Sequence, residues 1–177
     1  MLQNLNATQE QADAARHAAF HDPLTSLPNR ALFNDRLEHG LARARRHGWM
    51  LAVMFIDLDD FKNINDTHDH AAGDQLLQPI VIRLKGAIRT DDTVSRHGGD
   101  EFLYLLLELK NEADAPRVAD KLIKTIGEPC ELTVDGIVIT AVVRPSIGIA
   151  ISPRDGQSGD ALIQSADSAM YRAKYGS

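Results

Sequence analysis

The sequence predicts an α+β fold in which helices cover a central, mostly antiparallel β-sheet. Two observations lead to this prediction. Strand-like apolar runs are joined in two places by short glycine-containing turns, which is typical of antiparallel hairpins. Segments with helical periodicity separate the other strands. The chain has 177 residues, of which 44% are hydrophobic and 25% charged, so one globular domain with a substantial core accounts for most of it.

The composition argues against several classes of protein. No apolar run approaches the roughly 20 residues that a membrane-spanning helix needs, and no signal peptide is visible at Met1. We therefore expect a cytoplasmic chain, or the cytoplasmic output domain of a membrane-tethered protein, with no membrane contact by this segment. The only cysteine, Cys130, precludes an intramolecular disulfide and disfavours a zinc–thiolate site.

The net charge is −6, which argues against nucleic-acid binding because that function usually shows a basic surface. It is compatible with a small phosphate-bearing substrate, since a bound divalent cation can bridge carboxylates and phosphate. The composition indicates nothing more about chemistry, which has to be inferred from the motifs.

The first part of the chain predicts two helices. Residues 2–20 are rich in Ala and Gln and hold few large apolar residues, so we expect this helix to pack against a partner helix. Two prolines within residues 22–30 interrupt it. A second helix follows, with apolar residues four positions apart, and ends at Gly48. We therefore expect an N-terminal linker helix over residues 1–21 and a single domain over residues 22–177.

The middle of the chain predicts a buried strand followed by a helix. The apolar run over residues 49–56 is typical of a strand that is buried on both faces. It ends abruptly in three aspartates, Asp57, Asp59 and Asp60. A helix is expected over residues 73–89. Pro79 lies inside it and should bend the helix or delay its start, because an interior proline costs roughly 3 kcal/mol.

The rest of the chain alternates hairpins and helices. Residues 93–97 and 102–107 are predicted to be strands joined at Gly98 and Gly99, whose positive φ angles would form a tight two-residue turn. The later predicted elements are a helix over residues 113–126, a hairpin that turns at Asp135 and Gly136, a strand over residues 146–152 and a helix over residues 159–174.

Acidic side chains gather where predicted strands end. Asp57 follows the buried strand, and Asp100 follows the glycine turn. If these strands are neighbours, both carboxylates meet at one edge of the sheet and repel each other unless a cation lies between them. Carboxylate oxygens with room for water suit Mg²⁺. A single loop aspartate is most simply a solvated side chain, but the stretch FIDLDDFKNINDTHDHAAGD holds six aspartates in twenty residues, which surface charge does not require.

Six motifs, in their order and spacing, closely resemble those of the GGDEF family, the diguanylate cyclases. They are DPLTSLPNR, FIDLDDFKNIND, HAAGD, RHGGDEF, SIGIAISPRDG and ADSAMYRAK, and they extend from about Asp22 to about Lys174. The resemblance implies a fold similar to adenylate cyclase catalytic domains and polymerase palms. It also implies the condensation of two GTP molecules into cyclic di-GMP and two pyrophosphates, in a homodimer whose subunits each hold one GTP.

The resemblance further implies a metal site for one or, as we expect, two Mg²⁺ (or Mn²⁺) ions. Its ligands would be Asp57, Asp100, Glu101 and the backbone carbonyl of Leu58. These ions would orient the triphosphate and neutralise charge at the α-phosphate. Asp100 would also help to deprotonate the attacking 3′-hydroxyl. Gly98 and Gly99 lack side chains, so GTP could lie against the backbone there.

Five further residues match the substrate site of the family. Lys62 is expected to contact phosphate and stabilise the transition state, and Lys174 to reach the terminal phosphates. Asn65 and Asp74 match the guanine readers, because a carboxylate accepts from both N1–H and the exocyclic amine, a pair that adenine lacks. His70 matches a substrate-site histidine, with a structural hydrogen bond as the alternative.

Arg89 and Asp92 form an RxxD pair shortly before the glycine turn. In the family this pair is the inhibitory site for a cyclic di-GMP dimer, and the planar fork of an arginine can grip phosphate and stack on guanine. A plain surface salt bridge is the alternative. The sequence departs from the family pattern at Asp69, where a glycine is usual, and at Arg144-Pro145, where proline requires an edge strand or a bulge.

Three functions fit these motifs. The first is an active cyclase, controlled through the opening helix by an upstream sensor domain. The second is a catalytically silent cyclic di-GMP receptor that binds through the RxxD pair. The third is a GTP-binding module that regulates a phosphodiesterase domain elsewhere in a longer protein. The complete GGDEF hairpin, together with Asp57 and Lys62, favours the first.

Overall fold

The computed structural model describes residues 2–68 and 70–176, so our expectation for Asp69 lies outside the described residues. The helices are α1 (Leu2–Phe20), α2 (Arg30–His47), α3 (Phe61–His68), α4 (His70–Ala87), α5 (Asp114–Ile126) and α6 (Gly159–Tyr175). The strands are β1 (Met50–Asp59), β2 (Thr93–Gly98), β3 (Glu101–Leu109), β4 (Cys130–Val134), β5 (Ile137–Ala141) and β6 (Arg144–Ser152). Within these ranges no helix is both long and apolar enough to cross a membrane.

The main sheet has four strands in the order β2-β3-β1-β6, and every pairing in it is antiparallel. β4 and β5 form a separate two-stranded sheet. The predicted α+β architecture is therefore confirmed. β1 lies between two other strands, which explains its uninterrupted apolar sequence. Pro145 lies on β6, an edge strand of this sheet, as a residue without a ladder donor requires.

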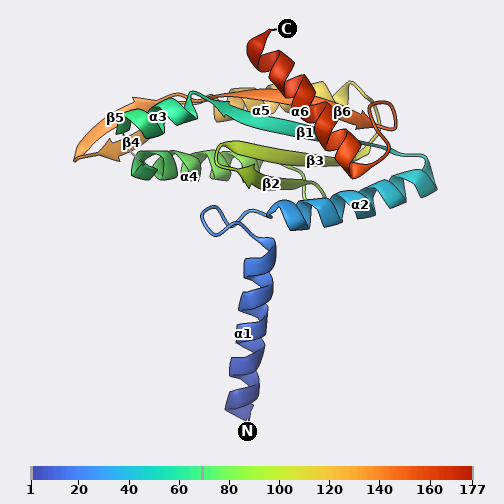
Figure 1. Cartoon of the computed structure of the whole chain (residues 1–177), viewed down its shortest axis with the longest axis horizontal. Coiled ribbons are helices and arrows are strands. Elements are labelled where there is room, and N and C mark those ends of the chain that lie inside the picture. The colour runs from blue at the N-terminus through green and yellow to red at the C-terminus, as the bar shows by residue number, and fades with distance from the viewer. Residues whose placement is uncertain (1, 69, 177) are drawn as a thin grey trace.

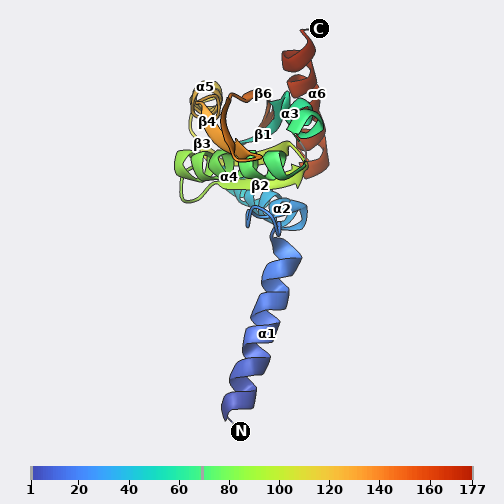
Figure 2. The same cartoon turned by 90° about the vertical axis from the view of Figure 1, so that its left-hand side faces the viewer.

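Different helices cover the two faces of the sheet. Alternate residues of β1 point to opposite faces. Met54 and Ile56 belong to the apolar cluster with α4 and α5, whereas Val53 and Phe55 belong to the cluster with α2 and α6. Figures 1 and 2 show α5 and α6 on opposite sides of the strands. Because Asp57 is two residues after Phe55, its side chain lies on the same face of the sheet, the one that α2 and α6 cover.

α1 extends away from the rest of the molecule (Figures 1 and 2). Its residues 5–20 are all exposed, including Leu5 and Phe20. The helix ends at Phe20, next to the boundary that we expect between residues 21 and 22. The residues that follow form an irregular loop, and the Asn29 side chain caps the start of α2 by accepting from the N–H of Leu32.

α4 differs from its prediction. It begins at His70, not at Gly73, and continues through Pro79, so the expected delayed start is wrong. Two alanines after His70 favour helix from the first turn, and burial of the apolar residues on both sides of Pro79, such as Leu77 and Ile80, outweighs the cost of the proline. The short helix α3 before it was not among the predicted elements.

The turn between β2 and β3 also differs from its prediction. Gly98 pairs with Glu101, so Gly99 and Asp100 form the turn, and neither Gly98 nor Gly99 has a positive φ angle. The predicted two-residue hairpin turn is present, but its predicted position and positive φ angles are wrong, because the register of the hairpin shifts between Arg96 and Gly98 and changes the geometry of the turn. The β4–β5 hairpin turns at Asp135 and Gly136 as predicted, and these two residues have positive φ angles of 50° and 77°.

Candidate active site

The structure brings the predicted metal ligands to one end of the sheet. Asp57 on β1 pairs in register with Glu101 on β3 and with Ser146 on β6. Asp100 lies in the adjoining turn, and its carbonyl oxygen accepts from the N–H of Leu58 at 3.0 Å. These carboxylates and the Leu58 backbone therefore come from two neighbouring strands and the turn between β2 and β3.

A lysine from α6 reaches this carboxylate cluster. Lys174 Nζ lies 2.8 Å from Oδ2 of Asp57 and 3.6 Å from Oδ1 of Asp59. The hydrogen bond to Asp57 raises the pKa of Lys174 above its ordinary value, so the ammonium stays charged and partly neutralises the cluster. We expected Lys174 to contact the terminal phosphates; in the structure it pairs with Asp57.

The environment of the other two acids of the cluster disfavours their ionised forms. Burial raises the pKa of Asp100, and the charge of Asp57 adds to this. Burial likewise raises the pKa of Glu101, with further contributions from Asp57 and Asp100. Asp57 is 8% exposed, and its Oδ1 is buried without a hydrogen-bond partner among the described residues. Closely spaced carboxylates with an unpaired buried oxygen fit a divalent cation in both charge and donor type.

The cluster is not a complete metal centre by itself. In residues 2–68 and 70–176, no group of three or more His, Cys, Asp or Glu side chains surrounds a common metal position. A cation here would complete its coordination with backbone oxygen, water or substrate phosphate, as is usual for Mg²⁺.

Four of the predicted substrate residues lie on α3 and α4, around the junction of these helices. Lys62, His70 and Asp74 are exposed on these helices. Asn65 packs directly on Gly73, where an added Cβ would lie 1.8 Å from Asn65 Oδ1. That oxygen is buried and has no hydrogen-bond partner in the part of the chain that the structure describes. Asn65 also lines a cavity of about 450 Å³ between this junction and the β4–β5 hairpin.

The structure does not join all predicted catalytic groups. Among the described residues Lys62 makes no hydrogen bond or ion pair, so no direct contact links it to Asp57 or Asp100. Lys62 lies on α3, which begins two residues after β1 ends. This short connection keeps α3 close in sequence to the Asp57 end of β1.

The predicted inhibitory pair divides into a buried and an exposed half. The side chain of Asp92 is fully buried, whereas that of Arg89 is 56% exposed. The Asp92 carboxylate accepts from Nε and Nη2 of Arg89 at 2.8 and 3.0 Å, from the Tyr104 hydroxyl at 2.7 Å and from the N–H of Leu107 at 3.0 Å. Burial, together with the bond to Asp92, raises the pKa of Tyr104. The pair is therefore anchored in the core and is more than a surface salt bridge.

Two polar residues of the cluster were missed as site residues. The Ser146 hydroxyl donates to both carboxylate oxygens of Asp59, at 3.0 and 2.8 Å. Asp59 could have been found from the period of two, because it shares a face of β1 with Asp57. Ser146 could not, because its pairing with β1 is set by the sheet register.

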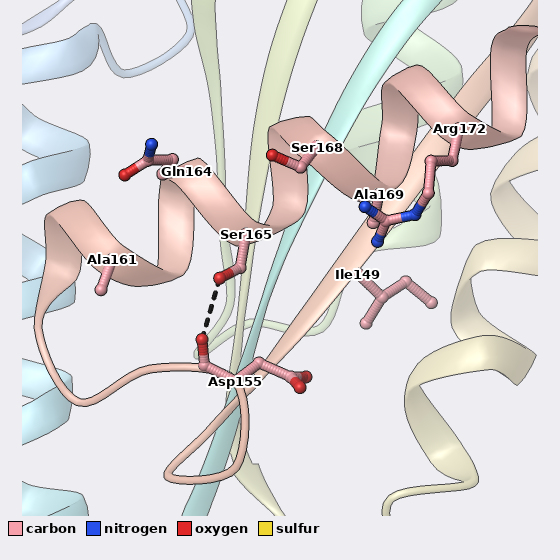
Figure 3. A pocket seen from close by; sticks show the side chains of 8 residues that line it. All are labelled: Ile149, Asp155, Ala161, Gln164, Ser165, Ser168, Ala169 and Arg172. Carbon is pink, nitrogen blue, oxygen red and sulfur yellow. Dashed lines mark hydrogen bonds between the residues drawn. The ribbon is translucent and has the colours of Figure 1, made fainter. Parts of the chain in front are cut away.

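A second cavity of about 450 Å³ lies beside α6 and contains none of the predicted site residues. Figure 3 shows Ser165, Ser168 and Arg172 on α6, with Asp155 and Ile149 opposite. The Ser165 hydroxyl donates to the Asp155 carbonyl at 2.9 Å, and the Asp155 carboxylate accepts from the N–H of Ile151. These bonds fasten the loop before α6, which gives the cavity wall a structural role.

Known proteins resemble this chain over most of its length. The family described as "Diguanylate cyclase, GGDEF domain" matches residues 19–176. Diguanylate cyclase TpbB of Pseudomonas aeruginosa is 46% identical over 166 residues, which cover 94% of this chain and 38% of TpbB. The chain thus spans less than two fifths of that relative.

Solved structures agree with the fold. The GGDEF domain of TpbB has a TM-score of 0.83 and 47% identity, covering 89% of this chain and 90% of that domain. The coiled coil and GGDEF domain of DgcB from Caulobacter crescentus, solved with c-di-GMP, has a TM-score of 0.88 and covers 99% of this chain and 91% of that one. At 24% identity, the second likeness concerns the fold alone.

Proposed function

The chain belongs to the GGDEF family of diguanylate cyclase domains, and from this premise we propose that it condenses two GTP molecules into cyclic di-GMP with release of two pyrophosphates. The observation that carries the proposal is the carboxylate cluster at the GGDEF hairpin. Its buried, unpaired Asp57 oxygen and the raised pKa values of Asp100 and Glu101 indicate a site that a cation stabilises.

We assign the metal ligands to side-chain oxygens of Asp57, Asp100 and Glu101 and to the carbonyl of Leu58. Because no three acidic side chains of the described residues surround one position, these ligands would be divided between the two expected ions. A bound Mg²⁺ or Mn²⁺ would polarise the 3′-hydroxyl and neutralise charge at the α-phosphate. The chain itself positions these oxygens through the β1–β3 register and through the Leu58 N–H that holds the Asp100 carbonyl. Asp100 accepts the proton of the attacking 3′-hydroxyl in this assignment.

Lys174 has two roles in this proposal. Its ammonium neutralises Asp57, from which it lies 2.8 Å away. A cation bound at Asp57 would repel the ammonium of Lys174, which would then be free to contact the terminal phosphates. Lys62 contacts phosphate from α3. Both lysines then stabilise negative charge on the departing pyrophosphate.

We assign guanine recognition to the α3–α4 junction. Asp74 accepts from N1–H and the exocyclic amine of guanine. Asn65 contributes its unpaired Oδ1, and His70 lies on the first turn of the same helix as Asp74. ATP lacks the matching donors, which would leave these groups unpaired and so disfavour its binding.

Regulation follows from two other parts of the chain. Arg89, held in place by Asp92, is the proposed contact for cyclic di-GMP at the inhibitory site. α1 is the proposed connection to an upstream sensor domain. Because the reaction joins two GTP molecules and the sequence holds a single GGDEF hairpin, turnover requires a homodimer.

The test is chromatography of nucleotides after incubation of concentrated protein with GTP and Mg²⁺, alongside Asp100→Asn. Cyclic di-GMP formed only by the unsubstituted chain would support the proposal. A chain that makes no product at any concentration, but still binds cyclic di-GMP, would instead be a receptor acting through Arg89. Binding of GTP and Mg²⁺ without product or cyclic di-GMP binding would point to a regulatory module.

A further inference from the structure

The guanidinium of Arg96 connects the turn that carries Asp100 to the loop after α1. On one side, Nε and Nη2 of Arg96 donate to the carbonyl oxygen of Gly99 at 3.3 and 3.0 Å. On the other side, Nη1 donates to both carboxylate oxygens of Asp22 at 3.3 and 3.2 Å. The side chains of Arg96 and Asp22 are only 16% and 18% exposed, so salt screens this pair less than a surface pair.

The turn depends on such contacts because Gly99 has no side chain to pack. A Cβ built at Gly99 would meet nothing within 4 Å. Hydrogen bonds hold the two turn carbonyls instead: Arg96 holds that of Gly99, and the N–H of Leu58 holds that of Asp100. Loss of the Arg96 contact would release one end of the turn, and a displacement of about 1 Å at a reacting group can lower a rate about 100-fold.

The loop between α1 and α2 is itself tied to α1 and to β2. Asn29 donates through its backbone N–H to the carbonyl of Phe20 at 2.9 Å and through Nδ2 to that of Ala19 at 2.8 Å. The backbone N–H of Arg96 donates to the carbonyl of Pro28 at 3.1 Å. A continuous path of hydrogen bonds therefore leads from the last turn of α1 to the turn at Gly99 and Asp100, which we call the catalytic turn.

The charge of Asp22 favours this contact. Burial opposes its ionisation, but hydrogen bonds from the N–H and hydroxyl of Thr25, at 2.9 and 2.7 Å, and the guanidinium of Arg96 outweigh burial. The pKa of Asp22 therefore lies below its ordinary value. The carboxylate is ionised at neutral pH and is oriented by donors from two segments of the chain.

We propose that Arg96 is a positioning residue for the reaction, one that makes the placement of the catalytic turn depend on the loop after α1. A rotation of α1 imposed from outside the domain would move the Asp22 carboxylate, and with it the anchor of the Gly99 carbonyl. This inference rests on the proposed function and deepens it by naming the contact through which the first helix reaches the turn.

Two conservative substitutions test the link from its two sides. Arg96→Lys keeps the positive charge but loses the planar fork that reaches both partners. Asp22→Asn keeps the shape of the side chain but removes its charge. Arg83→Lys is the matched control, because Arg83 on α4 is also half-buried and also donates to backbone carbonyls, those of Ile126, Glu128 and Pro129.

We expect Arg96→Lys and Asp22→Asn each to lower kcat about tenfold and to change the KM for GTP less than about threefold. The Tm of each variant should differ from that of the unsubstituted chain by no more than the Tm of Arg83→Lys does. The double variant should be no slower than the slower single variant, because both act through one contact. Losses that multiply in the double variant, or an unchanged kcat in Arg96→Lys, would overturn the inference.

Hydrogen exchange of the intact chain without nucleotide provides a readout that does not depend on turnover. Peptides covering residues 98–101 should exchange several-fold faster in Asp22→Asn and Arg96→Lys, and at the original rate in Arg83→Lys. Equal exchange in all variants would overturn the inference. Faster exchange supports the link between loop and turn even in a preparation that makes no cyclic di-GMP, so failure of the proposed function is distinguished from failure of the link.

Discussion

The carboxylate of Asp92 is occupied inside the domain, and this limits what it can offer a ligand. A carboxylate has about four acceptor positions, and those of Asp92 are used by Arg89, Tyr104 and Leu107. The guanidinium of Arg89 is oriented by these contacts yet exposed to solvent. At the inhibitory site, Arg89 is therefore the group that can contact cyclic di-GMP, and Asp92 holds it in place.

The two residues should accordingly respond differently to substitution. Asp92→Asn should lower the free energy of unfolding by about 3 kcal/mol, because charged hydrogen bonds are lost in a buried position, and so lower Tm by roughly 6–12 °C. Arg89→Lys should change Tm little but weaken product inhibition about tenfold, because it loses the planar fork. Thermal unfolding and initial rates at increasing cyclic di-GMP measure both. Inhibition that is unchanged in Arg89→Lys would contradict the assignment of this site.

The carboxylate cluster predicts a stability that depends on pH and on metal. The pKa values of Asp100 and Glu101 are raised in the folded chain, above the ordinary 3.8 and 4.5. Their contribution to stability is therefore complete below these ordinary values and is lost as pH rises through the raised values. At neutral pH the ionised cluster destabilises the fold, and a cation should reverse this.

Mg²⁺ should therefore raise Tm at neutral pH and have progressively less effect as pH falls through the raised pKa values, because protonated carboxyls no longer bind the cation. Asp100→Asn should have a higher Tm than the unsubstituted chain in a chelator at neutral pH, and a smaller response to Mg²⁺. Differential scanning fluorimetry with and without chelator measures these shifts. An equal Mg²⁺ response in Asp100→Asn would contradict its role as a ligand.

At the scale of the element, α4 carries two glycines with opposite expected effects. A Cβ on Gly73 would lie 1.8 Å from Asn65 Oδ1, whereas a Cβ on Gly86 would meet nothing within 4 Å. Gly73→Ala should therefore displace the Asn65 side chain, which can rotate away with limited loss of stability. Gly86→Ala should stabilise the helix by about 0.5–1 kcal/mol.

Kinetics separate the two variants. The KM for GTP should rise about tenfold in Gly73→Ala, the scale of one lost polar contact, and stay unchanged in Gly86→Ala. Tm should rise slightly in Gly86→Ala. An unchanged KM in Gly73→Ala, with the variant folded by circular dichroism, would show that Asn65 does not take part in GTP binding.

At the scale of the whole molecule, the sequence predicts features that depend on local pattern. The alternation in β1 and the apolar stripes of the helices are local, and the meeting of Asp57 and Asp100 follows once their strands are neighbours. The prediction of the glycine-turn geometry was wrong because this geometry depends on a register shift next to Arg96. The pairing of Lys174 with Asp57 spans 117 residues, so only the folded chain brings these two residues together.

Assembly supplies the last prediction. α1 exposes residues 5–20 and projects from the domain (Figure 1), and an isolated helix of this kind gains stability by packing on a partner. If two copies must meet for turnover, the rate of cyclic di-GMP formation per chain should rise with protein concentration and level off once dimers dominate.

Initial rates over a wide range of chain concentration, compared with the mass measured by light scattering at the same concentrations, test this dependence. Mixing the unsubstituted chain with an excess of Asp100→Asn should lower the rate further, because mixed dimers hold one defective half-site. A rate per chain that stays constant through concentrations at which light scattering finds only monomers would contradict the dimer requirement. The two measurements together distinguish weak assembly, which slows the reaction without changing the site, from a defect in the carboxylate cluster, which persists in the dimer.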